Sequence, residues 1–142
     1  MQIHRHALVR YTPEQMFDLV NDVEAYPRRF PWCLGAQVIE RDAQHLVARL
    51  DLRFAGVTQH FTTRNTLERP HSIRMHFVDG PFDWLHGVWS FAALGDSGCK
   101  VSLDLDFEVS NKLTGFAFGL GFKKLADRMV DDFCSEARHA YG

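Results

Sequence analysis

Residues 112–141 read KLTGFAFGLGFKKLADRMVDDFCSEARHAY, and this stretch decides the fold. Its apolar residues recur at steps of three and four, which is the spacing of one helix face. They are Phe122, Ala126, Met129, Phe133, Ala137 and Ala140. Roughly 28 helical residues at 1.5 Å each would reach about 42 Å, enough to cross a whole sheet. The pattern predicts one long C-terminal helix with Asn111 as its cap, and it places Phe122, Met129 and Phe133 against a sheet.

The chain before this helix predicts the sheet. Runs at 46–54, 73–77 and 101–109 alternate apolar and polar residues, which is typical of antiparallel strands with one wet face. Turn residues separate an opening strand at 3–9 from further strands at roughly 36–42, 45–54, 57–68, 72–79, 85–94 and 99–109.

Two short helices are predicted after the opening strand. Thr12 and Gln15 have the pattern of a capping box, and Pro13 suits the first helical position. They start a helix that is expected to end near Val20. A further helical turn is expected to stop at Tyr26, because Pro27 disfavours helix in the residue before it. The sequence therefore predicts a single α+β domain, residues 1–142, in which a curved antiparallel sheet wraps around the long C-terminal helix.

The amino-acid composition limits the classes of function that the chain can have. The chain has 142 residues, of which 46% are hydrophobic and 13% aromatic, so one domain can bury a core and still line a cavity. The formal net charge of −2 argues against a general nucleic-acid binder, and no DNA partner is expected. The 3 cysteines are far apart in sequence, which favours reduced thiols, and the first residues lack a signal-peptide pattern. We therefore expect a cytoplasmic protein.

Three stretches are candidate sites, and each has a plain structural alternative. Residues 26–33, YPRRFPWC, form a proline-stiffened loop that either seals the core or makes the lip of a cavity. Residues 79–84, DGPFDW, are either a hairpin connection or a gate. Residues 113–122 contain glycines that each cost about 1 kcal/mol relative to Ala inside a helix. This segment either packs closely on the sheet, or acts as a lid or as a surface for a membrane or partner.

Patterns for catalysis and metal binding are missing from the sequence. The histidines lack a ligand spacing such as His-Glu-x-x-His, and neither a Gly-x-Ser-x-Gly elbow nor a phosphate loop occurs. Cys33 has no base nearby in sequence. The shared strand face of Asp104, Asp106 and Glu108 is typical of a solvated sheet surface. We therefore expect a protein that is not an enzyme and uses no metal and no cofactor.

An ordered set of motifs carries a family resemblance over nearly the whole chain. The motifs are Tyr26-Pro27 with Phe30-Pro31-Trp32-Cys33, the run Phe61–Asn65, the run Val78–Phe82, Trp89-x-Phe91, and Asp106-Phe107-Glu108 followed by Asn111-Lys112-Leu113. The chain resembles the coenzyme Q-binding, START-like family, and within it the bacterial RatA-type members.

The resemblance implies a helix-grip (START-like, Bet v 1-like) fold with an elongated apolar cavity, and two functions. Some members are similar in role to lipid chaperones that bind ubiquinone and support respiration. RatA-type members are described as toxins that bind the large ribosomal subunit and block its joining to the small one. A third class, a cyclase-like enzyme, would need a titratable group inside the cavity.

The first choice is non-catalytic binding of an isoprenoid quinone such as ubiquinone, as a ligand and not as a cofactor. Residues expected to line the cavity are Phe30, Trp32, Phe54, Phe77, Phe82, Trp89, Phe91 and Phe116, with Thr62 and Arg64 as polar groups for the quinone head. The expected partner is this quinone or another lipid-like molecule, with transient contact at the periphery of the inner membrane. The alternative partner is the large ribosomal subunit, met by a patch of Arg28, Arg29, Lys123 and Lys124.

Overall fold

The computed structural model describes residues 1–54, 56–110 and 115–142, with the side chains of residues 115 and 116 left out. The elements follow the order that the sequence predicts. They are β1 (Gln2–Val9), α1 (Pro13–Asn21), the 3-10 turn η1 (Val23–Ala25), α2 (Tyr26–Arg29), β2 (Cys33–Arg41), β3 (His45–Phe54), β4 (Val57–Glu68), β5 (Ser72–Asp79), β6 (Phe82–Leu94), β7 (Gly98–Val109) and α3 (Gly115–Tyr141).

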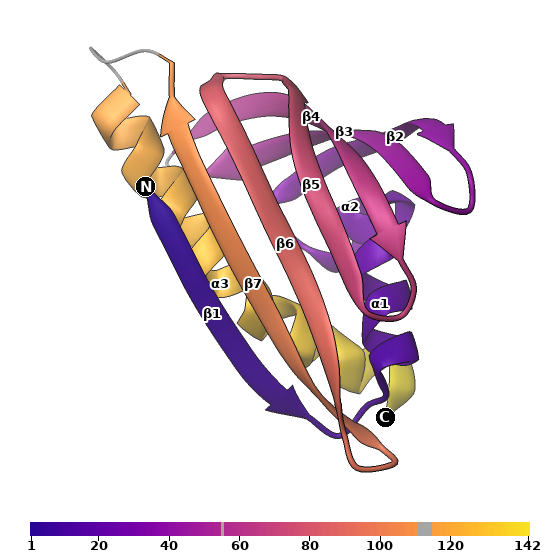
Figure 1. Cartoon of the computed structure of the whole chain (residues 1–142). Helices are drawn as coiled ribbons and strands as arrows, with labels where there is room; N and C mark the ends of the chain where they lie inside the picture. Colours follow the sequence, from indigo (N-terminus) through magenta and orange to yellow (C-terminus); the bar gives the residue numbers. More distant parts are fainter. Residues whose placement is uncertain (55, 111–114) are drawn as a thin grey trace.

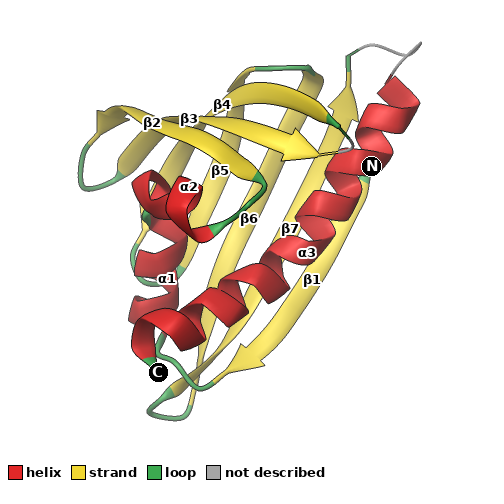
Figure 2. Ribbon diagram, turned by 180° about the vertical axis from the view of Figure 1, so that it is seen from behind, coloured by secondary structure: helices red, strands yellow, loops and turns green. Residues whose placement is uncertain are grey.

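The strands form a 7-stranded antiparallel sheet in the order β1-β7-β6-β5-β4-β3-β2. Figure 1 shows the sheet from its outer face with α3 behind it, and Figure 2 shows α3 crossing the inner face from behind. At one end of the sheet, α1 and α2 lie beside the C-terminal end of α3 (Figure 2). The predicted α+β architecture, a curved sheet around one long helix, is confirmed.

The start of α1 is fixed by the predicted capping box. The Thr12 hydroxyl accepts a hydrogen bond from the Gln15 backbone nitrogen at 3.1 Å, and the Gln15 side chain accepts one from the Thr12 nitrogen at 2.9 Å. The predicted further turn is η1, whose C-cap is Tyr26, but the chain stays helical there because α2 begins at Tyr26 and has Pro27 in its first turn. Proline is tolerated at this position, where the backbone N–H has no partner inside the helix.

Two strands begin earlier than the sequence pattern indicates. β2 starts at Cys33, and β6 starts at Phe82, before a register shift that lies between Phe82 and Trp84. The 79–84 stretch is therefore a tight connection. At Gly80, with a φ of 144°, an added Cβ would lie 2.6 Å from the Cβ of Phe61. This stretch thus matches the hairpin alternative better than the gate.

The core lies between α3 and the inner face of the sheet. Phe122 and Phe133 are 2% and 1% exposed, which confirms that they face the sheet. Ala140, by contrast, is exposed. Gly119 packs closely on the N-terminus, since an added Cβ would lie 2.8 Å from the Cε of Met1. In the part of the chain that the structure describes, no helix is long and apolar enough to cross a membrane.

Candidate functional site

A cavity of about 60 Å³ lies between the sheet and the helices. Its walls are mostly apolar and come from α1, η1, α2, α3 and five strands. The strand residues are Ala48, Leu50, Phe61, Thr63, Asn65, Ile73, Met75, Leu85, Trp89, Leu103 and Leu105, and the others are Val20, Asn21, Val23, Tyr26, Phe122, Met129 and Phe133. Among them Phe61, Met75 and Met129 are only partly buried. An apolar pocket with a few polar groups is the usual form of a small-molecule site.

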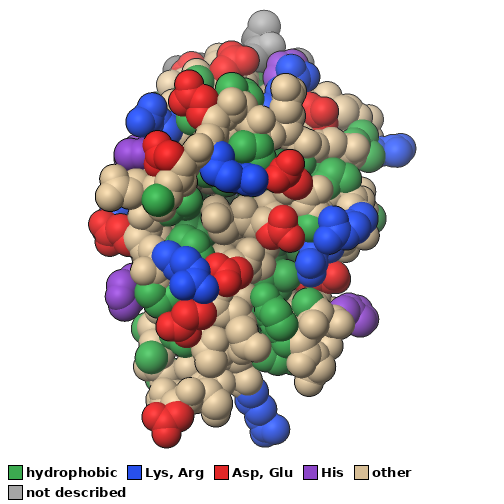
Figure 3. Space-filling view, turned by 90° about the vertical axis from the view of Figure 1, so that its right-hand side faces the viewer, with side chains coloured by type: hydrophobic (Ala, Val, Ile, Leu, Met, Phe, Trp, Pro, Cys, Tyr) green, Lys and Arg blue, Asp and Glu red, His purple; other side chains and the backbone are tan. Residues whose placement is uncertain are grey.

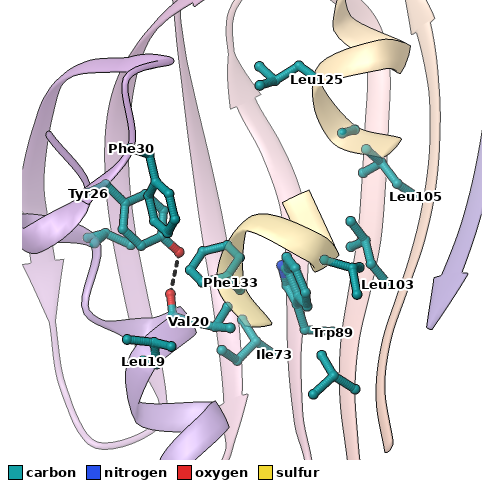
Figure 4. Packing of buried hydrophobic residues seen from close by; sticks show 14 of the residues in the cluster. Leu19, Val20, Tyr26, Phe30, Ile73, Trp89, Leu103, Leu105, Leu125 and Phe133 are labelled. Carbon is teal, nitrogen blue, oxygen red and sulfur yellow. Dashed lines mark hydrogen bonds between the residues drawn. The ribbon is translucent and has the colours of Figure 1, made fainter. Parts of the chain in front are cut away.

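Aromatic rings close one end of this cavity. Figure 4 shows Phe133 of α3 between Tyr26 and Phe30 on one side and Trp89 on the other. The ring centroids of Phe133 lie 5.4 Å from Tyr26, 4.7 Å from Phe30 and 5.3 Å from Trp89. Trp32 stacks on Phe30 at 4.7 Å and donates its Nε1 proton to Asp132 of α3 at 2.9 Å. The loop at 26–33 therefore seals the core at this end.

Burial fixes the protonation state and the hydrogen bond of the Tyr26 hydroxyl. Its hydroxyl donates a hydrogen bond to the carbonyl of Val20 at the end of α1 (Figure 4). Burial raises the pKa of Tyr26 far above its usual value. The phenol therefore stays neutral, and its hydroxyl continues to donate a hydrogen bond to the Val20 carbonyl.

Three further polar side chains line the cavity. Asn21 is the last residue of α1, whereas Thr63 and Asn65 lie on β4. The Thr63 hydroxyl donates to Asn65 Oδ1 at 2.9 Å. Asn21 Oδ1 is buried and has no hydrogen-bond partner. Asn21 thus lines the cavity and carries an acceptor atom that has neither a donor nor exposure to solvent.

The predicted polar pair for a ligand head lies elsewhere. Arg64 is exposed, and its neighbours in register are Val47 and His76. Because side chains alternate along a strand, the inward position of Thr63 and Asn65 turns Arg64 to the outer face. Thr62 is 7% exposed but does not line the cavity. The assignment of Arg64 to the cavity is therefore corrected, and Thr63 and Asn65 take that place.

The predicted aromatic residues are dispersed. Trp89 lines the cavity. Phe54 and Phe82 line a second hollow beside Phe118 of α3, which shares Phe61 and Phe122 with the cavity. The ring centroid of Phe77 lies 6.0 Å from that of Phe82.

The remaining predicted residues do not line the cavity or fall outside the description. Phe30 and Trp32 belong to the aromatic seal, and Phe91 packs on Phe17 of α1 at 5.9 Å. The side chain of Phe116 lies outside the described residues. The structure therefore does not join these residues into one continuous cavity.

The predicted cationic patch is also dispersed. Arg29 Nη1 lies 3.4 Å from Glu136 Oε1, and Nη2 lies 4.0 Å from Asp22. Lys123 is 13 positions before Glu136 on α3, about 20 Å along a helix. Figure 3 shows basic and acidic side chains interspersed on the side of the molecule where β2 lies. Arg28, Arg29, Lys123 and Lys124 thus do not form one surface.

The described residues contain no cluster of three or more His, Cys, Asp or Glu that could hold a metal ion. Burial raises the pKa of the Cys33 thiol to about 11, so the thiol is protonated at neutral pH. Since the thiolate is the reactive form, Cys33 is poorly suited to act as a nucleophile.

Comparisons with known proteins agree with this geometry. A family model described as "Polyketide cyclase / dehydrase and lipid transport" matches residues 9–134. The chain is 46% identical over 140 residues to "Ribosome association toxin RatA" of Escherichia coli K12, covering 99% of this chain and 89% of that protein. It is 28% identical over 137 residues to "Coenzyme Q-binding protein COQ10 homolog B, mitochondrial" of Xenopus laevis, covering 93% of this chain and 56% of that protein.

Solved structures confirm the helix-grip fold. TTHA0849 from Thermus thermophilus superposes with a TM-score of 0.87 at 16% identity, with 100% of both chains covered. A START superfamily protein from Mycobacterium smegmatis gives 0.84 at 20% identity over 98% of both chains. The Zhui aromatase/cyclase of Streptomyces gives 0.81 at 15% identity over 97% of this chain and 93% of that one. At these identities the likeness concerns the fold alone.

Proposed function

Because the chain belongs to the polyketide cyclase/dehydrase and lipid transport family, we propose that it binds an isoprenoid quinone such as ubiquinone under α3, without catalysing a reaction. The observation that carries this proposal is the cavity, whose walls are apolar apart from Asn21, Tyr26, Thr63 and Asn65. Such walls suit a substituted ring with a hydrocarbon tail. A relative named as a coenzyme Q-binding protein supports the same ligand class. In this role the chain would support respiration.

The cavity must widen to hold this ligand. Its volume of about 60 Å³ is below the roughly 300–1,000 Å³ of typical ligand sites. The wall includes Phe61, Met75 and Met129, which are only partly buried. Methionine side chains are unbranched and adapt to irregular spaces, so their displacement enlarges the cavity at low cost. We therefore expect the quinone to enter by displacing these residues, while the aromatic seal around Phe133 stays closed.

The test is mass spectrometry of an organic extract of the protein, purified from cells that make ubiquinone. We expect quinone in a fixed molar ratio to protein. Protein that is stripped and incubated with ubiquinone should recover this ratio. A folded protein that carries no quinone from such cells and takes up none on incubation would refute the proposal.

As a second function we propose association with the large ribosomal subunit that blocks subunit joining, and the names of relatives support ribosome association. Proteins named "Ribosome association toxin RatA" from Escherichia coli and Pseudomonas aeruginosa are 46% and 44% identical over 99% of this chain. Arg64 and Arg74 are exposed on β4 and β5, and neither forms an ion pair with another described residue. Unpaired surface cations are the groups that bind phosphates in a salt-dependent way.

Co-sedimentation with purified large subunits at low salt tests this second function. Wild-type protein should pellet with the subunits, and the double variant Arg64→Glu, Arg74→Glu should not. The variant Arg41→Glu reverses a charge that already pairs with Glu24 at 2.8 Å, and it is the matched control. Wild-type protein that stays in the supernatant at low salt would exclude ribosome association.

A further inference from the structure

We propose that the outer face of the sheet, over β4, β5 and β6, binds a single strand of RNA. A base stacks on the exposed ring of Trp84, and phosphates pair with Arg64 and Arg74. This inference rests on the second proposed function, ribosome association, and deepens it by naming the chemistry of the segment that the chain contacts on the subunit.

The outer face of β6 carries an exposed pair of stacked rings. Trp84 and His86 alternate along β6 with the buried Leu85, which places both rings on the outer face. The centroids of Trp84 and His86 lie 5.4 Å apart with an angle of 22° between the ring planes, and Trp84 is 41% exposed. Val78 on β5 is a second exposed apolar side chain of this face. The ring pair is therefore a flat aromatic surface that remains open to a ligand.

Cationic side chains lie beside this ring pair. Arg64 of β4 is opposite His76 of β5, which is in turn opposite His86 of β6, so the three residues form one row across adjacent strands. Figure 1 shows these strands side by side on the outer face. Neighbouring strands are about 5 Å apart, so the backbones of Arg64 and His86 lie about 10 Å apart. Arg74 precedes His76 by two positions and shares its face.

The two arginines are available to phosphates. Arg64 and Arg74 are exposed, and neither forms an ion pair with another described residue. The net charge of the chain is −2, so an anionic polymer has little general attraction to the protein. Binding is therefore confined to a local surface of this kind.

Carboxylates lie on the other side of the ring pair, on β7, and two of them are bonded to β1. Asp104 Oδ1 lies 2.7 Å from His4 Nδ1, and Asp106 Oδ2 accepts a hydrogen bond from Gln2 at 3.5 Å. A third, Glu108, lies opposite the tryptophan of the ring pair. The charge of the outer face thus changes sign across β6. Phosphates are expected over β4 and β5, and the neutral base over the ring pair.

This combination suits a single strand better than a duplex. Aromatic rings beside cations are the groups with which proteins bind single-stranded nucleic acid, because each base has a flat face and each nucleotide a phosphate. The bases of a duplex are stacked inside the helix and cannot reach a ring on a flat sheet. RNA follows from the second proposed function, since the ribosome supplies unpaired RNA.

Titration with a short, unstructured oligouridylate tests the inference. Of the three tryptophans, which all lie in the described part of the chain, Trp32 and Trp89 are buried and Trp84 is exposed. Quenching of the intrinsic fluorescence by a bound base therefore reports on Trp84. Anisotropy of a labelled oligouridylate measures the affinity over a series of salt concentrations. We expect saturable quenching, weaker binding at higher salt, and weaker binding of an RNA duplex of the same length.

Variants separate the stacked base from the phosphates. Trp84→Ala should weaken binding roughly 5- to 150-fold, the range for loss of one base–aromatic stack. Trp84→Phe keeps a ring, so it should retain most of the affinity and lose the quenching. The double variant Arg64→Gln, Arg74→Gln should lower the slope of log K against log salt by about 1.4, since each phosphate contact on a single strand contributes about 0.7. Leu8→Ala changes an exposed side chain on β1 and is the matched control.

Co-sedimentation of the same variants with large subunits completes the test. Quenching together with the loss of affinity in Trp84→Ala supports the inference, and if that variant does not fold, retained binding without quenching in Trp84→Phe does so. Absence of oligouridylate binding, or affinity that Trp84→Ala leaves unchanged, overturns the inference. Wild-type protein that still pellets with subunits then leaves ribosome association standing. If Trp84→Ala abolishes pelleting although the wild type binds no oligouridylate, the face binds a protein and the inference is equally overturned. Wild-type protein that neither binds RNA nor pellets overturns both.

Discussion

A substitution that fills the cavity should abolish ligand binding without lowering the stability of the protein. Ala48 lies on β3, is 3% exposed and lines the cavity, so Ala48→Leu extends a side chain into the void. Voids cost about 24 cal/mol per Å³, so removing the whole 60 Å³ would raise the free energy of unfolding by about 1.4 kcal/mol. Part of this gain is lost to side-chain strain. We therefore expect a stability between that of the wild type and about 1.4 kcal/mol above it, together with a loss of quinone binding.

Urea denaturation and quinone titration of the same samples measure the two effects. Ala93→Leu is the matched control, because Ala93 on β6 is exposed and does not line the cavity. The control should stay within about 0.5 kcal/mol of the wild type and bind quinone normally. A folded Ala48→Leu protein that binds quinone as tightly as the wild type would refute this reasoning. So would a destabilisation of about 1–3 kcal/mol, which indicates an overpacked site instead of a void.

Three further predictions concern the fold. Phe133→Ala removes a ring that contacts Tyr26, Phe30 and Trp89 and should cost about 3–5 kcal/mol in urea denaturation, and a loss below about 1 kcal/mol would contradict its place in the seal. Thr12→Ala should lower the free energy of unfolding by about 1 kcal/mol because it removes the helix cap, whereas Thr12→Ser should retain most of the wild-type stability. Burial raises the pKa of the Cys33 thiol from 9.0 to about 11. The stability that the neutral thiol contributes is therefore present below about pH 9 and is lost as the pH rises through 11. A pH series in which the free energy of unfolding of Cys33→Ala declines as much as that of the wild type would contradict this.

The fold could be predicted because its signals are local and repeated. The apolar stripe of α3 places Phe122 and Phe133 on one face, and the period of two in β7 buries one side of that strand. Errors arose at boundaries, where tertiary contacts extend an element beyond its local pattern. β6 begins at Phe82 because this ring packs on Phe107 and Phe122 at 5.8 Å and 5.0 Å, contacts that lie far apart in sequence.

The polar residues of the cavity escaped prediction for a different reason. Thr62 and Arg64 looked suited to a quinone head by residue type, but strand parity decides which side chains face inward. Their alternates Thr63 and Asn65 pair in register with Ala48 and Leu46 of β3. Those β3 residues belong to a clear apolar face. If the register between β3 and β4 had been known from the sequence, it would have placed Thr63 and Asn65 on the inner face of the sheet.

Asn21 could not be found in this way. It lies at the end of α1, and its place in the cavity wall depends on how the helix docks on the sheet. The sequence around it shows only a helix that ends, since docking is set by contacts between segments that are distant in the chain. The same holds for the aromatic rings, whose number in the sequence indicated apolar surface but not which rings form the cavity and which form its seal.

The void and the unpaired acceptor Asn21 Oδ1 both lower the stability of the protein. The void of about 60 Å³ costs about 1.4 kcal/mol, and a buried unpaired acceptor costs about 1–3 kcal/mol. Together they are a sizeable share of the roughly 5–15 kcal/mol by which domains are stable. A leucine at Ala48 or Asn21 would remove one cost each without changing the fold. A ligand that occupies the cavity relieves the cost of the void, so its binding should raise the free energy of unfolding in proportion to the logarithm of its concentration.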